Sequence, residues 1–335
     1  MMKSVAGHCA LILIVGVSAS LASAMAAAKG RYATFDIAGS SYTDPASVNS
    51  AGTVAGTYED RSGVDHGFFR TSDGTITTFD PSGSTDTTAS GINRGGAIAG
   101  SYTDSTGVSR GFVRASDGTF TTFNVSGSIC TVAIGITRGG TTTGFYCDSN
   151  YAPHGFVRAS DGAITTFDAP GATETSPAAI NDGGTITGDY EDHSGTHGFA
   201  RESDGTMTTF DPPGSAKTLP ASINGGGVIA GSFNDSAGTS HGFIRTADGK
   251  ITTFAAAGST TYANSIDDRN RITGAFIPNG TTILGFERRS NGTIRILKVP
   301  GSLYTSPQSI SSTGGWITGS WNPDQPGSYG FLRSP

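Results

Sequence analysis

The sequence predicts an all-β fold, a seven-bladed β-propeller of four-stranded antiparallel blades in which the N-terminal strand closes the last blade. Three observations predict it: a repeat of about 44 residues, turn signals between short apolar segments in every repeat, and complementary ends of the repeat array. Glycine is abundant, 50 residues in 335, but lacks the three-residue period of collagen. Charged residues make up only 14% of the chain, too few for a charge-rich disordered protein.

The N-terminus has the three parts of an export signal. Lys3 supplies the positive start, residues 10–22 form an apolar run, and Ala22-Ser23-Ala24 offers small residues for cleavage. The apolar run is shorter than the roughly 20 residues that span a bilayer. We therefore expect a secreted or periplasmic protein without membrane association. Its expected parts are a cleaved signal peptide over 1–24, a short linker over 25–30 and the propeller over 31–335.

Three landmarks recur seven times in the body and define units one to seven. The first is the last residue of a Thr-Thr-Phe-like segment: Phe35, Phe79, Phe123, Phe167, Phe210, Phe254 and Leu297. The second is the arginine of Gly-Phe-x-Arg or its variants: Arg70, Arg114, Arg158, Arg201, Arg245, Arg288 and Arg333. The third is an apolar residue followed by a small polar one, at 48–49, 92–93, 136–137, 180–181, 223–224, 266–267 and 310–311. A fixed period of this length is typical of repeat architectures.

Each unit predicts four short strands, which we name A, B, C and D. In unit four the expected strands are 177–181, 185–190, 197–201 and 206–211. Asp182-Gly183 and Asp204-Gly205 separate the first pair and the last pair, and Asp-Gly between apolar runs indicates an antiparallel hairpin. No segment of the unit has the length and 3.6-residue period of a helix.

The two ends of the array complement each other. The body begins with an isolated strand D at 32–36, and its last unit stops after strand C at 330–333. In a closed ring the first strand completes the last blade. An open β-solenoid, the competing architecture, has no need of this match.

At these residues the chain resembles the HAF-type extracellular repeat proteins of bacteria. The matching segments are His66-Gly67-Phe68 with its equivalents at His154, His197 and His241, and Ile180-Asn181-Asp182-Gly183-Gly184. The chain departs from the family motif in having Gly for Ala, and three units replace the His by Arg110, Leu284 and Tyr329. The resemblance implies an exported, propeller-like protein and carries over no catalytic residue.

Two cysteines remain after signal removal, Cys130 and Cys147 in unit three. If the A–B turn holds the two residues Arg138-Gly139, paired positions sum to 277, as 130 and 147 do. Because export compartments are oxidising, we expect a disulfide across this hairpin.

Two sets of residues are candidates for ligand binding. A polar ring at the end of strand A, nearest the axis, can hold a ligand at the channel mouth, although Asn and Asp also favour turns. Three tyrosines in the expected D–A connections of consecutive units can form an exposed aromatic patch, although scattered surface aromatics are common. The ring is Asn49, Asn93, Asn181, Asn224 and Asp267, and the patch is Tyr42, Tyr262 and Tyr304.

The histidines and arginines of strand C favour structural roles. Repeated residues on an outer strand of adjacent blades are too far apart to converge on one metal ion or anion. We expect the histidines to pack or to bond loops, and the arginines to pair with acids such as Asp36, Asp80 or Asp168, or to lie along the blade edge. His193, His197, Glu191 and Asp192 form the one local cluster, with turn formation favoured over a metal.

The sequence favours a binding or scaffolding module over an enzyme. It has no nucleophile elbow, phosphate loop or His-Glu-x-x-His motif, so we name no catalytic residue, metal ligand or cofactor. The net charge of −6 argues against nucleic acid. We expect a monomer whose rim of D–A and B–C loops binds a glycan or another protein. The alternatives are a secreted lyase or hydrolase with its site at the channel mouth, and a structural cell-surface or matrix protein.

Overall fold

The computed structural model describes residues 32–257, 260–323 and 327–335. The predicted signal peptide and linker lie outside these described residues. Within them the chain is all-β, with 28 strands, and no helix is present that is long and apolar enough to cross a membrane.

The strand bounds follow the repeat. Strands β1 to β14 are Tyr32–Phe35, Tyr42–Val48, Val54–Glu59, Asp65–Arg70, Ile76–Phe79, Ser84–Ile92, Ile98–Asp104, Ser109–Arg114, Phe120–Phe123, Cys130–Ile136, Thr142–Cys147, Pro153–Arg158, Ile164–Phe167 and Glu174–Ile180. Strands β15 to β28 are Ile186–Asp192, Gly195–Arg201, Met207–Phe210, Ser215–Ile223, Ile229–Asp235, Ser240–Arg245, Ile251–Phe254, Thr260–Ile266, Ile272–Ile277, Leu284–Arg288, Ile294–Leu297, Tyr304–Ile310, Ile317–Asn322 and Tyr329–Arg333. In unit four, strand A begins three residues earlier than we expected from the sequence.

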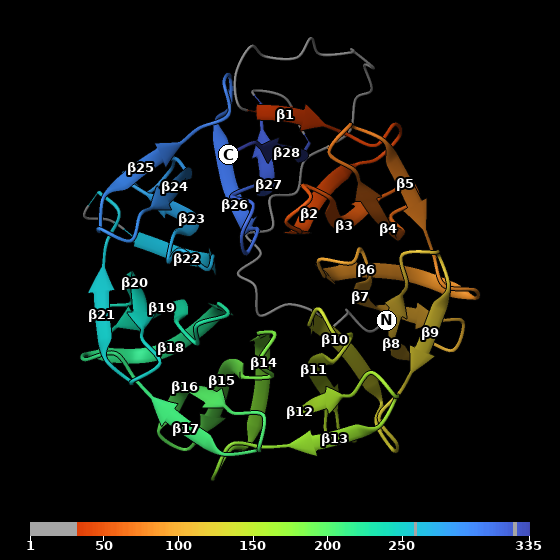
Figure 1. Cartoon of the computed structure of the whole chain (residues 1–335), viewed down its shortest axis with the longest axis horizontal. Helices are drawn as coiled ribbons and strands as arrows, with labels where there is room; N and C mark the ends of the chain where they lie inside the picture. The colour runs from red at the N-terminus through yellow and green to blue at the C-terminus, as the bar shows by residue number, and fades with distance from the viewer. Residues whose placement is uncertain (1–31, 258–259, 324–326) are drawn as a thin grey trace.

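The strands form antiparallel groups of four around a central axis, with strand A innermost and strand D outermost (Figure 1). In unit one the order is β2-β3-β4-β5. Units two and three are joined by one parallel pair, Cys130 opposite Ser109, and units four and five by another, Thr196 opposite Lys217. Each joined pair of units therefore makes an eight-stranded sheet.

The first and last described strands belong to one sheet. β1 pairs with β28 in antiparallel fashion, with Tyr32 opposite Arg333 and Phe35 opposite Gly330. The sheet order β1-β28-β27-β26 is the pairing that the complementary ends predicted.

The three turns inside unit one share one form. In unit one, three residues separate Asn49 from Thr53, and the Asn49 N–H donates to the Thr53 carbonyl at 2.9 Å. The B–C and C–D turns repeat this bond, from Asp60 to Val64 and from Thr71 to Thr75. Gly52 has a φ of 79°, the left-handed conformation that the third residue of such a turn requires. The two-residue A–B turn expected from the sequence is thus wrong by one residue.

A β-bulge in strand A restores the register that the longer turn shifts. In unit three Ile136 lies opposite Thr142, and a bulge between Ala133 and Gly135 brings Cys130 opposite Cys147. The two cysteines form a disulfide. The expected cysteine pair is present because the extra residue in the turn and the extra residue in the bulge shift the register in opposite directions.

Neighbouring units are held together by contacts between the phenylalanine that ends strand D of one unit and the Gly-Phe-x-Arg arginine of the next. The Arg158 guanidinium lies 4.9 Å from the centroid of Phe123 in the preceding unit, and its NH1 donates to the Ala159 carbonyl. Such pairs are cation–π contacts. The expected pairing of these arginines with acids is therefore wrong for units one to six, where the preceding landmark is a phenylalanine. The other pairs are Arg70 on Phe35, Arg114 on Phe79, Arg201 on Phe167, Arg245 on Phe210 and Arg288 on Phe254.

Unit seven replaces this contact by an ion-pair network. Its preceding landmark is the aliphatic Leu297, and Arg333 instead lies 3.4 Å from the carboxylate of Glu287. Glu287 is also 3.6 Å from Arg271, which pairs with Asp267 at 2.7 Å. The side chains of Glu287 and Arg333 are only 5% and 4% exposed. The network lies where units six and seven meet.

Candidate functional site

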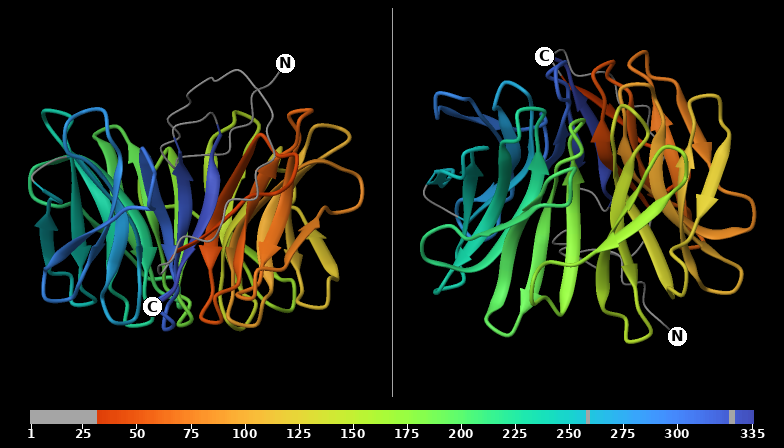
Figure 2. Two further views of the ribbon diagram at one scale, coloured as in Figure 1. Left: turned by 90° about the horizontal axis from the view of Figure 1, so that it is seen from above. Right: turned by 60° about the horizontal axis from the view of Figure 1, so that its bottom comes forward.

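The molecule has two ends, at which loops and turns connect the strands (Figure 2). One end, which we call the A–B face, carries the A–B and C–D turns. The opposite end, the B–C face, carries the B–C turns and the D–A connections. Antiparallel pairing of four strands places the turns in this way. The two candidate sets from the sequence lie on different faces.

The predicted polar ring lies at the A–B face, where the structure uses its atoms internally. Asn49 is 6% exposed, and its Oδ1 accepts bonds from the N–H groups of Ala51 and Thr53, both at 3.0 Å. Its Nδ2 donates to a carbonyl of the next unit, as in three other units. The bonds run from Asn49 to Asn93 (3.2 Å), Asn93 to Thr137 (3.1 Å), Asn181 to Asn224 (3.0 Å) and Asn224 to Asp267 (3.0 Å). Asp267 is fully buried and binds Arg271. These residues shape turns and join units.

The three tyrosines lie inside strand A and not in the D–A connections, so that expectation is wrong. Tyr42 and Tyr304 are the first residues of β2 and β26, whereas Tyr262 is the third residue of β22. The Tyr304 hydroxyl lies 3.4 Å from Ser320 Oγ. The Tyr42 hydroxyl donates to the Asp65 carboxylate. Tyr42 therefore contacts the first residue of strand C in unit one.

Three of the four histidines of strand C connect the B–C turn to the D–A connection. In unit one His66 Nδ1 lies 2.8 Å from Asp80, and Nε2 lies 3.5 Å from Asp60. His154 and His197 make equivalent contacts with Asp168 and Asp211. His241 instead lies 2.9 Å from Asp235 of its B–C turn, and Ala255 stands where the D–A connections of the other three units have the aspartate. Among the described residues no group of three or more His, Cys, Asp and Glu side chains is arranged to hold a metal ion.

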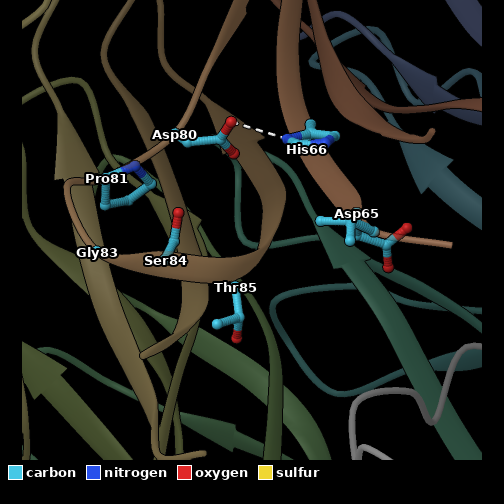
Figure 3. A pocket seen from close by; sticks show the side chains of 8 residues that line it. Asp65, His66, Asp80, Pro81, Gly83, Ser84 and Thr85 are labelled. Carbon is cyan, nitrogen blue, oxygen red and sulfur yellow. Dashed lines mark hydrogen bonds and ion pairs between the residues drawn. The ribbon is translucent and has the colours of Figure 1, made fainter. Parts of the chain in front are cut away.

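A pocket of about 260 Å³ lies beside this connection in unit one (Figure 3). One wall is the start of β4, and the other is the connection from β5 to β6 together with the first two residues of β6. The His66–Asp80 bond joins the two walls (Figure 3). The lining residues are Val64, Asp65, His66, Asp80, Pro81, Gly83, Ser84 and Thr85.

The electrostatics of the pocket are dominated by carboxylates. Burial and the charges of Glu59 and Asp86 raise the pKa of Asp65, although the hydrogen bond from Tyr42 opposes the rise. Burial, together with the bond to Asp65, raises the pKa of Tyr42. Burial lowers the pKa of His66, but the hydrogen bonds and charges of Asp80 and Asp60 outweigh this and raise it.

A second carboxylate, that of Asp44, lies deeper in unit one. Asp44 is on β2, two residues after Tyr42 and therefore on the same face of the strand. Burial raises the pKa of Asp44 to about 6, with a further contribution from Asp65 and an opposing hydrogen bond from Ser320. Unit one thus contains two half-buried carboxylates that ionise with difficulty. Perturbed carboxylates next to a pocket are typical of binding and catalytic sites.

Asp44 and Asp65 are the site residues that the sequence reasoning missed. The residue before the strand C His or its equivalent is Asp65 in unit one, but Ser109, Pro153, Thr196, Ser240, Ile283 and Ser328 in the others. Asp65 is the charged exception in that column. The signal that reveals Asp65 is a residue that differs in chemical type from its equivalents in the other six units.

No protein-family model and no curated protein matches the chain. Solved structures with the same architecture do match. A streptogramin B lyase has a TM-score of 0.61 and 15% identity, over 91% of this chain and 97% of that one. The virginiamycin B lyase of Staphylococcus aureus has the same score and identity, over 91% and 99%. The β-propeller domain of the Trilobed protease of Pyrococcus furiosus has a TM-score of 0.59 and 10% identity, over 87% and 95%. These similarities show that the fold is a β-propeller.

Proposed function

We propose that the protein is an exported, seven-bladed β-propeller that binds a glycan or protein ligand at its B–C face. The blade count takes each four-stranded group as one blade, with β1 completing the last. The observation that carries the binding proposal is the unit-one pocket, which lies between a B–C turn and a D–A connection. Loops on a rigid frame commonly carry recognition.

Export is part of this proposal. The sequence pattern of 1–24 supports a signal peptide, followed by the linker 25–30 and the propeller over 31–335. The disulfide between Cys130 and Cys147 is in keeping with an oxidising compartment, secreted or periplasmic. The HAF-type resemblance of the His-Gly-Phe segments points the same way. We propose that the protein acts as a monomer.

A ligand screen tests the binding proposal. The mature protein is applied to a glycan array and to a peptide array, and each hit is checked by thermal shift, because a ligand of the folded state raises the melting temperature. Thr85→Trp fills the pocket and should weaken a true ligand at least tenfold. Thr75→Trp, at an exposed position of the opposite face, is the matched control. A screen without hits, or a ligand lost only in Thr75→Trp, contradicts the proposal.

The tyrosines provide a second contact set on the same face. Tyr42, Tyr262 and Tyr304 come from three consecutive units of the ring, and Tyr42 adjoins the pocket through Asp65. If they form part of the site, Tyr304→Ala changes the glycan profile. An unchanged glycan profile would show that Tyr304 is not part of the site. The role of the pocket is tested separately by Thr85→Trp.

One observation favours a hydrolase as the second candidate. Ser194 Oγ lies 2.9 Å from His197 Nε2, and His197 Nδ1 lies 2.7 Å from Asp211. In this arrangement the imidazole can take the hydroxyl proton while Oγ attacks an ester carbonyl. The array lies on a B–C turn and not at the expected channel mouth. Ser194 also donates to Asp192 at 2.6 Å, as Ser62 does to Asp60, which supports turn formation as the competing role.

A fluorophosphonate probe separates the two roles of Ser194. An activated serine is labelled covalently, and Ser194→Ala abolishes the labelling. Ser62→Ala is the matched control. Ser62 occupies the same turn position in unit one, but its hydroxyl bonds to Asp60 and His66 bonds to Asp80 and Asp60. Absence of labelling in the wild-type protein rules out the serine-hydrolase version.

A further inference from the structure

We infer that a cavity between units five and six binds the anionic group of an acidic sugar, which gives the molecule a second binding site on its A–B face. This site goes beyond the proposed function, because it lies on the face opposite to the unit-one pocket and does not depend on that pocket. Three observations carry it: a cavity whose charged lining residue is an arginine, an exception in the repeat that leaves this arginine without an acid, and the uncharged polar groups beside it.

The cavity has a volume of about 220 Å³ and lies between two units that are neighbours in the ring (Figure 1). One wall belongs to unit five, and the other is formed by the A–B turn of unit six and by the end of its β24 with the C–D turn that follows. The lining contains one charged side chain, that of Arg288, and no Asp or Glu. The lining residues are Val228, Ile244, Thr246, Thr252, Asn270, Arg288 and Ser290.

The repeat normally places an aspartate near this arginine, and unit six lacks it. The C–D turns of units one to five contain Asp-Gly, and in unit one the charge of Asp73 acts on Arg70. Unit six has Asn291 at this position. Asn291 keeps the turn, since its Oδ1 accepts the Thr293 N–H at 3.0 Å as the aspartate of unit one accepts the equivalent N–H. The replacement therefore removes the negative charge beside Arg288 and leaves the turn intact.

The Arg288 guanidinium is held in place and still has donors to offer. It lies 4.9 Å from the centroid of the Phe254 ring, and NH1 donates to the Arg289 carbonyl at 3.3 Å. Burial lowers the pKa of Arg288, and no neighbouring acid opposes this among the residues that the structure describes. A guanidinium has five N–H donors in a planar fork that suits carboxylate and related oxyanions. The ring contact thus fixes a cation whose remaining N–H groups can bind an anion.

Further positive charge lies in the turns of unit six. Arg269 in the A–B turn and Arg289 in the C–D turn are exposed, and each is next to a lining residue in the chain. The carboxylates of the adjoining turns, Asp268 and Asp248, accept hydrogen bonds from donors of unit five. On a protein with a net charge of −6, this local excess of arginine favours an anionic ligand.

Unit six also adds a polar side chain to the cavity. Asn270 has a φ of 57° at the turn position where units one to five have glycine. Its Oδ1 accepts a hydrogen bond from Asn224 Nδ2 at 2.8 Å, which leaves the N–H donors of its own amide for a ligand. Thr252 and Ser290 add hydroxyl groups to the same lining.

These groups favour a sugar over an acidic peptide. A single cation with several uncharged donors and acceptors matches a ligand that has one anionic group and several hydroxyl groups. An acidic peptide brings carboxylates without hydroxyl groups, so the polar side chains would have no partners from the ligand. The aliphatic side chains of Val228 and Ile244 can contact the C–H groups of a sugar ring. Carboxylate and sulfate are the two anionic groups that the experiment has to distinguish.

The experiment measures fluorescence anisotropy of a labelled oligomer of glucuronic acid with the mature protein at low salt. The methyl ester of the same oligomer removes the charge and keeps the sugar. A sulfated glucose oligomer tests sulfate as the anion, and oligoglutamate tests an acidic peptide. The acid should bind at least tenfold more tightly than its ester, because a hydrogen bond to a charged group is stronger than one to a neutral group.

Asn291→Asp restores the aspartate of units one to five and leaves Arg288 in place. It should weaken binding of the glucuronic acid oligomer roughly threefold, the scale of one partly exposed ion pair. Asn279→Asp adds the same charge to an exposed B–C turn of unit six, on the opposite face, and should leave binding unchanged. Arg288→Gln should weaken binding at least tenfold; because it also removes the contact with Phe254, its melting temperature is measured alongside.

Thr85→Trp, in the unit-one pocket, should leave this binding unchanged. Equal effects of Asn291→Asp and Asn279→Asp would contradict the inference, as would equal binding of the acid and its ester, or binding of oligoglutamate alone. If Thr85→Trp abolishes binding and Asn291→Asp does not, the sugar binds at the B–C face, so this inference fails and the proposed function stands. Binding of the sulfated oligomer alone, weakened by Asn291→Asp, would support the site and identify sulfate as its anion.

Discussion

Single residues act in this protein chiefly by joining one unit to the next. In units one to six the arginine of the Gly-Phe-x-Arg segment lies over an aromatic ring of the preceding unit, and Arg158 has a buried Nε without a hydrogen-bond partner. Its contribution therefore comes from the ring contact more than from hydrogen bonds. His66, His154 and His197 act within a unit, where each joins a B–C turn to a D–A connection.

Arg158→Gln should lower the free energy of unfolding by about 1–2 kcal/mol, the size of a partly desolvated cation–π contact. Urea unfolding measures it. In a Phe123→Leu background the same substitution should cost less, because the ring is already absent. Arg61→Gln, at an exposed turn, is the control and should change stability by less than about 0.5 kcal/mol. Equal losses with and without Phe123 would contradict the contact.

His197 should make stability depend on pH. The hydrogen bond and charge of Asp211 raise the pKa of His197 in the folded state. A raised histidine pKa contributes stability below the unfolded value of about 6.5, and this contribution is lost as the pH rises through the folded value. Thermal melts should therefore show His197→Gln to be more destabilising at pH 5.5 than at pH 8.5. His193→Gln, exposed in the same turn, should show no such difference.

At the scale of the strand and the hairpin, the turn and the bulge determine which residues meet. In units one to six the A–B hairpin combines a three-residue turn with a bulge in strand A, for example between Pro45 and Ser47, and in unit seven the turn has four residues. The bulge falls beside a proline in units one, four, five and seven, where a missing N–H is tolerated. Unit three uses the resulting register to place its two cysteines opposite each other.

The Cys130–Cys147 bond closes a loop of 17 residues and should add about 3 kcal/mol to the free energy of unfolding. The double variant Cys130→Ser, Cys147→Ser should unfold at correspondingly lower urea concentration. Unfolded, unreduced mature protein should contain no free thiol by titration. Two titratable thiols in that sample would show that the bond does not form.

The sequence predicted the strands well and the site poorly, for physical reasons. Strand positions follow from turn residues and apolar segments, which recur in every unit and reinforce one another. The pocket depends on Asp65, which departs from the repeat, and on its distance to Tyr42, 23 residues away. The polar ring was found by position, but its bonds to the next unit needed the packing of two units. The arginine partners were misjudged because the ring lies in the neighbouring unit.

At the scale of the whole molecule, the junction of units six and seven differs from the others. Leu297 stands where the other units have Phe, and the Asp267–Arg271–Glu287–Arg333 network takes the place of the stacked arginine. Arg333 belongs to β28, the strand that also pairs with β1. The network therefore supports the sheet in which the two chain ends meet.

Glu287→Gln should be strongly destabilising, by about 3 kcal/mol, because it removes the negative charge between two guanidinium groups in a buried site. Glu202→Gln, at the exposed C–D turn of unit four, is the matched control and should be near neutral. Chemical unfolding measures both. If the two variants unfold at the same urea concentration, the network does not support the junction.

The pairing of β1 with β28 has a consequence for biosynthesis. Tyr32 and Arg333, which lie opposite each other, are separated by about 300 residues of chain. At roughly 5–20 residues per second, translation delivers the second partner about 15–60 s after the first. Until then β1 has no partner strand, so the last four-stranded group can be completed only after β28 has been synthesised.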